Sequence, residues 1–314
     1  MAKTNECKTN KDGKIMSLLA DFFYIDDLIK HNGANNLNYP SVTEINDIVY
    51  DESNEYGKLD LLFDENQLPE SGLYPVVFNI HGGGWITGDK RFRRGVSLQF
   101  ANSGNFVVNI NYALTPKYTY KDEVQNIFSA LKWVQNNAEK YKLDLNKMVI
   151  TGDSAGAHLS AVTIVTLLDT NWQQKFSVEP LDINFKGTIL FCGPYDFTEF
   201  WMRFPVLDTM LKGISGVKRK KDVNNSEFVD YLNPLPAITK EFPRSLVVMG
   251  AQDFVTNPHS RKLMRKFDEL GVQYERHLSK NFFNSFHCFH LKIWMPSAKR
   301  AMKKACDFVR EVIK

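Results

Sequence analysis

The sequence predicts an α/β fold in which a mostly parallel sheet carries helices on both faces. Two observations support this prediction. From about residue 46 onward, short runs rich in valine and isoleucine alternate with longer segments of helical periodicity. Strands rich in these residues, alternating with helices, are typical of a mostly parallel sheet covered on both faces. In such sheets, ligands bind beyond the carboxyl ends of the strands, so those positions are examined first for function.

Eight strands and four main helices are expected. The first two strands, at residues 47–50 and 59–63, are expected to form an antiparallel pair. The other strands are expected at residues 75–80, 106–112, 147–151, 187–192, 245–249 and 274–278. The helices are expected at residues 123–140, 154–168, 260–270 and 297–313.

Two stretches interrupt this alternation. Residues 1–43 carry apolar side chains at a spacing that predicts one or two amphipathic helices. Residues 196–242 separate two strands by a long insertion, and such insertions are usually lids or specificity elements. We therefore expect an N-terminal cap segment at residues 1–43 and one large domain at residues 44–314, with residues 196–242 contributing to the same cap.

Composition and charge exclude several functional classes. The net charge of +3 is too small to indicate a nucleic-acid partner. The basic run at residues 218–221 is interpreted as a solvated loop, with an anionic partner as the alternative. No stretch approaches the ~20 apolar residues of a membrane span. Residues 1–14 are polar and lack the apolar core of a signal peptide, which predicts a cytoplasmic protein. A chain whose leader had been removed would look the same.

The four cysteines do not form a recognisable framework. They lie at positions 7, 192, 288 and 306, without the C-x-x-C spacing of a zinc site. We therefore expect reduced thiols and no zinc site.

Two motifs follow predicted strands and carry the functional signal. The pentapeptide GDSAG, residues 152–156, follows an apolar run and precedes a helical segment. A serine on so sharp a strand-to-helix turn has an exposed hydroxyl, and the flanking glycines avoid clashes across the turn. The second motif, HGGGW at residues 81–85, follows the apolar run at residues 76–80. We expect the backbone N–H groups of Gly83, Gly84 and Ala155 to form an oxyanion hole.

A serine hydroxyl needs a base within hydrogen-bond reach, and the base needs an orienting acid. In folds with this type of turn the chain order is serine, acid, histidine. Asp253 follows the strand at 245–249, and His287 follows the strand at 274–278. We therefore predict Ser154 as nucleophile, His287 as base and Asp253 as orienting acid. His290 is the alternative base, although it leads into the last helix, which restricts how its ring can turn.

At these motifs the chain resembles α/β-hydrolase esterases of the hormone-sensitive-lipase-like type. It looks closest to the bacterial carboxylesterases that include acetylxylan and feruloyl esterases. The resemblance extends from about residue 75 to the C-terminus. Besides the two motifs above, it rests on NYALTP at 111–116, CGPYD at 192–196, GAQD at 250–253 with Pro258, and the H-x-F pattern at 287–289.

The resemblance implies an α/β-hydrolase fold and a serine carboxylesterase that forms an acyl-enzyme and needs no metal ion and no cofactor. Its substrates would be short-chain acyl or aryl esters, with acetyl or feruloyl esters of carbohydrates as narrower candidates. The chain departs from the family in three places. It has YALTPK at 112–117 instead of Y-R-L-A-P-E, and Gln125-Asn126 instead of an acidic pair. It also has Cys288 in place of the glycine of H-G-F.

Three further residues are candidates for contacting the substrate, namely Trp85, His158 and Trp201. Each has a purely structural alternative, as a core ring for Trp85, a packed helix residue for His158 and ordinary packing for Trp201. An arylformamidase-like amidase is the rival activity, because its relatives share the elbow G-x-S-A-G-A-H-L. A non-catalytic ligand-binding scaffold would be expected to lack a triad residue, and none is missing from the sequence.

Overall fold

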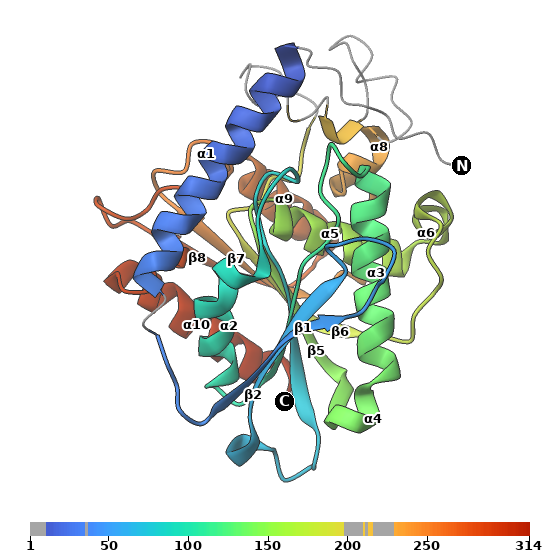
Figure 1. The fold of residues 1–314 in the computed structure, drawn as a ribbon, viewed down its shortest axis with the longest axis vertical. Helices are drawn as coiled ribbons and strands as arrows, with labels where there is room; N and C mark the ends of the chain where they lie inside the picture. The colour runs from blue at the N-terminus through green and yellow to red at the C-terminus, as the bar shows by residue number, and fades with distance from the viewer. Residues whose placement is uncertain (1–10, 35–36, 198–209, 211–212, 216–228) are drawn as a thin grey trace.

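The sheet predicted from the sequence is present in the computed structural model, which describes residues 11–34, 37–197, 210, 213–215 and 229–314. Its strand order is β1-β2-β4-β3-β5-β6-β7-β8 (Figure 1). β1 pairs with β2 and β2 with β4 in antiparallel fashion, and the other neighbours are parallel. The eight strands are β1 Val42–Val49, β2 Lys58–Asp64, β3 Tyr74–Ile80, β4 Phe106–Ile110, β5 Leu143–Asp153, β6 Phe185–Phe191, β7 Arg244–Gly250 and β8 Tyr274–Ser279.

Helices cover both faces of this sheet, as expected for parallel strands that are apolar on both sides. α2 and α10 pack on one face, and α3, α5 and α9 pack on the other. The α-helices are α1 Lys11–Ala34, α2 Arg94–Ala101, α3 Tyr120–Asn136, α4 Ala138–Tyr141, α5 Ala155–Leu168, α6 Thr170–Phe176, α8 Val229–Leu232, α9 Asn257–Leu270 and α10 Pro296–Val312. Short 3-10 helices are η1 Glu65–Gln67, η2 Lys90–Arg93, η5 Leu235–Ala237 and η6 Phe289–Leu291.

The core divides into two apolar clusters because successive strand residues point to opposite faces of the sheet. In β3, the side chain of Phe78 belongs to the cluster under α3 and α5, whereas that of Val77 belongs to the cluster under α2 and α10. The parallel pairing of β3, β5, β6, β7 and β8 places their carboxyl ends at one edge of the sheet, and Ser154, Asp253 and His287 follow three of these ends.

Element boundaries differ from the predicted ones where side chains cap the helices. The helix expected at 123–140 begins at Tyr120 because Thr119 and Asp122 form a reciprocal capping box. It ends at Asn136, and α4 continues as a separate turn. The first strand begins at Val42, five residues before its predicted start. α2 and α6 were not predicted from the sequence, because they are too short for helical periodicity to be distinctive.

One of the departures from the family pattern has a local compensation. Asn126 accepts a hydrogen bond from the backbone N–H of Ala113 at 2.8 Å and donates one to Asp51 at 2.8 Å. The amide therefore braces the segment after β4 without the charge pair that the family pattern would supply.

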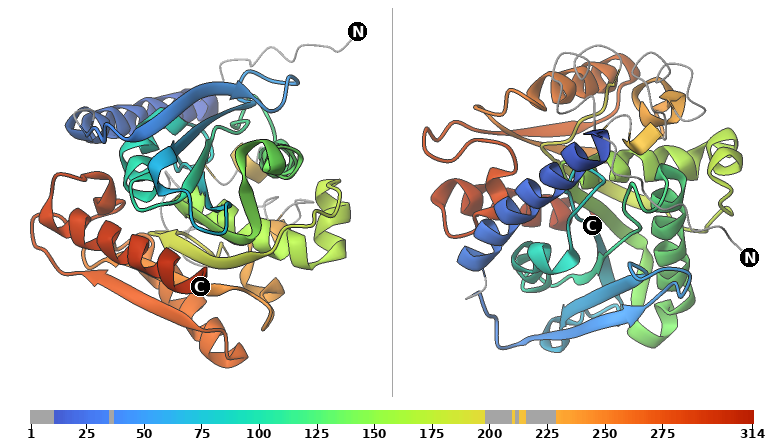
Figure 2. Two further views of the ribbon diagram at one scale, coloured as in Figure 1. Left: turned by 90° about the horizontal axis from the view of Figure 1, so that it is seen from below. Right: turned by 45° about the horizontal axis from the view of Figure 1, so that its top comes forward.

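A single helix, α1, occupies most of the N-terminal stretch for which one or two amphipathic helices were predicted. In both views of Figure 2 it lies against the segment that contains η2 and α2. Its apolar side chains are divided, because Leu19 and Phe23 are partly buried, whereas Leu18 is 69% exposed and Phe22 is 66% exposed. The helix therefore buries only part of its apolar side chains and leaves the others exposed.

The inserted stretch at 196–242 falls mostly outside the described residues, so its predicted role in a cap stays a prediction, as does the division at residue 43. Among the helices that the structure describes, none combines the length and the apolarity needed to cross a membrane.

Candidate active site

The turn between β5 and α5 holds Ser154 in a strained backbone conformation. Its φ is 53° and its ψ is −118°, which few residues other than glycine adopt. The flanking glycines are required by close packing of the backbone. A Cβ on Gly156 would collide with the carbonyl oxygen of Ile80, and one on Gly152 would lie 2.5 Å from the Gly156 carbonyl carbon. The motif thus folds as a sharp elbow.

Ser154, His287 and Asp253 are brought together from three separate strand ends. The Nε2 atom of His287 lies 2.9 Å from the Oγ atom of Ser154. The Nδ1 atom of the same ring lies 2.9 Å from Oδ2 of Asp253. With the proton on Nδ1, the ring donates to Asp253 and accepts from the serine hydroxyl, which is the arrangement that a general base requires.

His290, the alternative base, lies elsewhere. Its side chain is buried and stacks on Phe191 with the ring centroids 4.0 Å apart. It is not among the residues that line the cavity at Ser154. The catalytic roles of the three assembled residues stay predictions, but the geometry favours His287 over His290.

Asp253 is anchored by hydrogen bonds as well as by His287. Its Oδ1 atom accepts from the backbone N–H groups of Val255 at 3.2 Å and Thr256 at 3.0 Å. Its Oδ2 atom accepts from the Thr256 hydroxyl at 2.5 Å. Burial disfavours the carboxylate, but the charge of His287 and these hydrogen bonds outweigh it and lower the pKa of Asp253 to about 2. The acid is therefore ionised at neutral pH.

The pKa of His287 is raised well above its ordinary value. Burial works against the imidazolium, but interactions with Cys288 and Asp253, including hydrogen bonds to both side chains, outweigh it. At neutral pH, the negative charge that raises the pKa of His287 is that of Asp253. Burial raises the pKa of the Cys288 thiol to about 12, so this thiol remains protonated and carries no charge. Asp253 therefore both orients the ring and strengthens it as a base.

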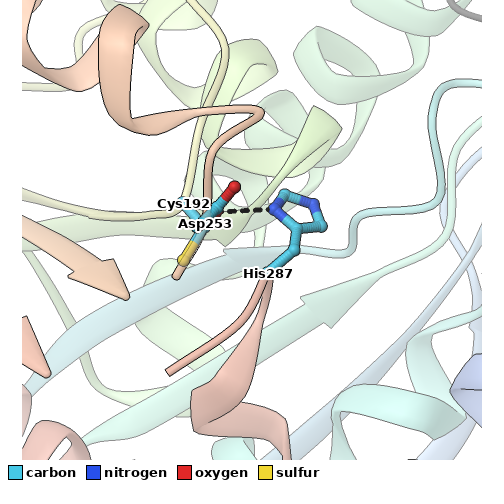
Figure 3. Close-up of side chains that lie close together, drawn as sticks. All are labelled: Cys192, Asp253 and His287. Carbon is cyan, nitrogen blue, oxygen red and sulfur yellow. Dashed lines mark hydrogen bonds and ion pairs between the residues drawn. The ribbon is translucent and has the colours of Figure 1, made fainter. Parts of the chain in front are cut away.

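Cys192, directly after β6, lies close to Asp253 (Figure 3). One ligand atom from each of Cys192, Asp253 and His287 can be chosen so that all three lie within 4.8 Å of one another. Burial, followed by the charge of Asp253, raises the pKa of the Cys192 thiol well above its ordinary value, and the thiol hydrogen-bonds to Asp253. The sequence analysis assigned no role to this residue.

The glycine loop, residues 81–85 after β3, curls toward the elbow. Gly83 and Gly84 have φ values of 135° and 61°, and the Gly83 carbonyl accepts from the N–H of Thr87 at 3.1 Å. A Cβ on Gly83 would collide with the carbonyl oxygen of Thr87. Ala155 is the first residue of α5, and the first N–H groups of a helix have no acceptor within it. Their roles as oxyanion donors stay a prediction.

A buried ion cluster joins the elbow to the N-terminal helix. The guanidinium of Arg93 donates to both carboxylate oxygens of Asp153, at 2.8 Å and 2.6 Å, and to Asp27 of α1 at 2.7 Å. Asp153 also accepts from the N–H of Gly82 at 3.1 Å. Burial opposes ionisation of Asp153, but the charge of Arg93 holds its pKa below the usual range. No local pattern in the sequence signals Arg93 or Asp27, because the contacts span 60 and 66 residues.

A cavity of about 430 Å³ opens on Ser154 and His287. Much of its wall is apolar, and it comes from several parts of the chain, among them α1, the glycine loop and the segment around His287. Residues that contribute to this wall include Phe22, Phe23, Trp85, Met210, Phe286 and Leu291. A second hollow of about 440 Å³ lies against α3, away from Ser154, and its lining is mostly polar.

The three predicted substrate-binding residues have different outcomes. Trp85 lines the cavity, and its Nε1–H donates to Nδ1 of His158 at 3.1 Å. His158 is fully buried and is not among the lining residues, and its Nε2–H donates to the Leu232 carbonyl at 2.8 Å. Both of its nitrogens are thus engaged, and burial lowers its pKa to about 3, so the alternative of a packed helix residue describes it. Trp201 lies outside the described residues.

Comparisons with known proteins agree with this architecture. A family model described as BD-FAE matches residues 59–267. The probable carboxylic ester hydrolase LipM of Mycobacterium tuberculosis is 32% identical over 213 residues, which cover 66% of this chain and 47% of LipM. The bovine arylacetamide deacetylase is 34% identical over 111 residues, or 33% of this chain and 28% of its own length. The chain matches about half the length of LipM and less of the deacetylase.

Solved structures share the fold over nearly the whole chain. Esterase B from Lactobacillus rhamnosis, inhibited by a tributyrin phosphonate, has a TM-score of 0.84, 22% identity and 97% coverage of both chains. A bacterial heroin esterase has a TM-score of 0.74 and 19% identity, with 95% of this chain and 93% of that one covered. At such identities the likeness shows the fold, which is that of an α/β-hydrolase.

Proposed function

The chain belongs to the BD-FAE family, within the hormone-sensitive-lipase-like α/β-hydrolases, and from this premise we propose that it hydrolyses carboxylic esters by a serine mechanism. The observation that carries the proposal is the relay from Ser154 through His287 to Asp253, with both contacts at 2.9 Å. A scaffold that only binds a ligand has no need to hold these three groups in line.

In the proposed mechanism, Nε2 of His287 accepts the proton of Ser154 as the hydroxyl oxygen attacks the ester carbonyl. The N–H groups of Gly83, Gly84 and Ala155 stabilise the negative charge that develops on the carbonyl oxygen. His287 then gives the proton to the leaving alcohol, and an acyl-enzyme remains on Ser154. Water activated by the same ring releases the acid, and Asp253 stabilises the imidazolium throughout.

Short-chain acyl or aryl esters are the proposed substrates. The cavity at Ser154 has aromatic and aliphatic walls, including Phe22, Phe23 and Met210, that suit an apolar acyl or aryl group. Relatives named as ester hydrolases support the reaction class, and an inhibitor derived from tributyrin is named for esterase B. Acetyl and feruloyl esters of carbohydrates are a narrower proposal that rests on the family alone.

A panel of p-nitrophenyl esters with acyl chains of increasing length tests the proposal. The native chain is expected to hydrolyse short esters, and Ser154→Ala is expected to lower kcat by about a millionfold while the protein stays folded. A fluorophosphonate probe should label the native protein at Ser154 and leave the variant unlabelled. Labelling of a different serine would move the nucleophile, and absence of turnover on every ester would remove the proposal.

The rival amidase reading is tested in the same assay. An N-formyl anilide offered beside the matched aryl ester distinguishes the two, because an arylformamidase should turn over the formamide at least as efficiently. We expect the ester to have the larger kcat/KM.

A further inference from the structure

We propose that Cys192, Asp253 and His287 form a binding site for a thiophilic divalent cation such as Zn²⁺, and that occupation of this site switches off the serine relay. The inhibitory part rests on the proposed ester hydrolysis, whereas cation binding does not. The three residues follow the adjacent strands β6, β7 and β8, so the sheet itself brings together a thiol, a carboxylate and an imidazole (Figure 3).

The spacing of the ligand atoms suits a small tetrahedral ion. With zinc–ligand bonds of about 2.0–2.3 Å, nitrogen, oxygen and sulfur ligands lie about 3.3–3.6 Å from one another. The three candidate atoms already lie within 4.8 Å of one another. The Asp253 oxygen and His287 nitrogen lie 2.9 Å apart, so admitting the ion requires this contact to widen by about 0.4 Å. The thiol must approach by about 1 Å at most.

Charge also favours a divalent ion at this position. Cys192 and Asp253 are almost completely buried, so an uncompensated charge between them would be costly. A divalent ion with one thiolate, one carboxylate and one neutral imidazole has no net charge. On binding, the sulfur–hydrogen bond of Cys192 breaks, the proton leaves to solvent, and a sulfur–metal bond forms in its place. No oxidant or reductant is needed.

Binding at Nδ1 of His287 would change the ring's tautomer. In the free protein, a proton on Nδ1 donates to Asp253 and leaves Nε2 to accept from the Ser154 hydroxyl. A cation on Nδ1 displaces that proton, so the neutral ring carries its proton on Nε2. Nε2 can then no longer accept the serine proton, and the nucleophile cannot be activated.

The ion can enter through the cavity. The side chain of His287 is 34% exposed and lines the cavity, whereas Cys192 and Asp253 are almost completely buried.

The next thiol along the chain, Cys288, provides a matched control. It is also buried and its side chain hydrogen-bonds to His287, but its sulfur does not belong to the group of mutually close ligand atoms.

Cation binding is tested without reference to catalysis on the full chain carrying Ser154→Ala. Titration with Co²⁺ as a spectroscopic probe should give a sulfur-to-cobalt charge-transfer band and intense visible bands of tetrahedral coordination, saturating at one ion per chain. Zn²⁺ should displace the Co²⁺, and Mg²⁺ should not. Adding Cys192→Ser should abolish the charge-transfer band, whereas adding Cys288→Ser should preserve it. Because Cys192 has a φ of 51°, Cys192→Gly is a second variant that suits this backbone.

Inhibition is tested on the native chain with a short ester. Zn²⁺ at micromolar concentration should reduce the rate at least tenfold, and a chelator should restore it. Each variant is normalised to its own metal-free rate, and Cys192→Ser and Cys192→Gly should need at least tenfold more Zn²⁺ than Cys288→Ser.

Two results would overturn the inference. The first is absence of the sulfur-to-cobalt band in the Ser154→Ala protein at saturating Co²⁺. The second is equal loss of cation binding or inhibition in the Cys192 and Cys288 variants. A protein that binds Co²⁺ through Cys192 but hydrolyses no ester would refute the proposed function and leave the cation site intact.

Discussion

At the scale of single residues, the candidate site depends on backbone positions as much as on side chains. Ser154 occupies a φ of 53°, and Cys288, directly after the proposed base, occupies a φ of 52°. The second value explains why glycine is common at this place in the family pattern, since glycine adopts positive φ without strain. Cys288 is buried there, with its sulfur 3.6 Å from Asp153.

Replacing each of the two histidines separately tests the assignment of the base. His287→Ala should lose nearly all turnover because Nε2 no longer faces the Ser154 hydroxyl. His290→Ala should unfold at lower temperature, because its ring is buried on Phe191, but should keep most of its activity per folded molecule. Steady-state kinetics on protein checked by circular dichroism measures both. Retained turnover in the first variant and loss in the second would move the base to His290.

The pH dependence of kcat/KM tests the link between Asp253 and the base. Only the neutral ring of His287 can accept a proton, so activity should fall as pH drops through the raised pKa of His287. Asp253→Asn removes the negative charge that holds this pKa up, and the acid limb should shift to lower pH. The same change should lower kcat by about 10⁴-fold, because the ring loses the partner that selects its tautomer. If the acid limb of the pH profile stays in place in Asp253→Asn, Asp253 does not set the pKa of His287.

At the scale of secondary-structure elements, α1 is tied to the elbow by charge. Arg93 is 2% exposed and Asp27 is 5% exposed, so their contact is shielded from solvent. Through this guanidinium the helix that supplies Phe22 and Phe23 to the cavity wall is connected to Asp153, next to the nucleophile.

Substituting Asp27 therefore tests whether α1 matters for the site. Asp27→Asn should destabilise the protein by about 3 kcal/mol, because a buried guanidinium loses one of its two charged partners. It should also raise KM as the cavity wall loosens. Asp21→Asn on the exposed side of the same helix is the control and should change neither quantity. Unfolding by denaturant and the KM for a short ester are the measurements. Equal behaviour of the two variants would show that the ion cluster does not hold α1.

At the scale of the whole molecule, the ionised carboxylate of Asp253 should contribute to acid stability. Its pKa of about 2 in the folded protein is lower than the ordinary value in the unfolded chain. The contribution is therefore fully present above pH ~4 and is lost as pH falls through about 2, with a magnitude of roughly 2–3 kcal/mol. Denaturant unfolding between pH 5 and pH 2 should show a shallower loss of stability in Asp253→Asn than in the native chain. Parallel curves would contradict this.

The parts that the sequence analysis predicted correctly depend on local patterns. The eight strands were recognised from short runs of four to seven residues, and the antiparallel start of the sheet from two such runs near residue 50. The elbow and the glycine loop were recognised because each motif directly follows a run of this kind. The predicted division at residue 43 and the cytoplasmic location stay predictions.

What the sequence by itself determined is the class of fold, the family and the chain order of Ser154, Asp253 and His287. Each depends on periodicity or on a motif a few residues long. Only the tertiary structure decided that Arg93 and Asp27 meet at the elbow, that His158 faces the core, and that the thiol of Cys192 lies beside Asp253. These contacts join residues tens of positions apart, and whether two such side chains meet depends on how strands order themselves in the sheet and on which helices cover them.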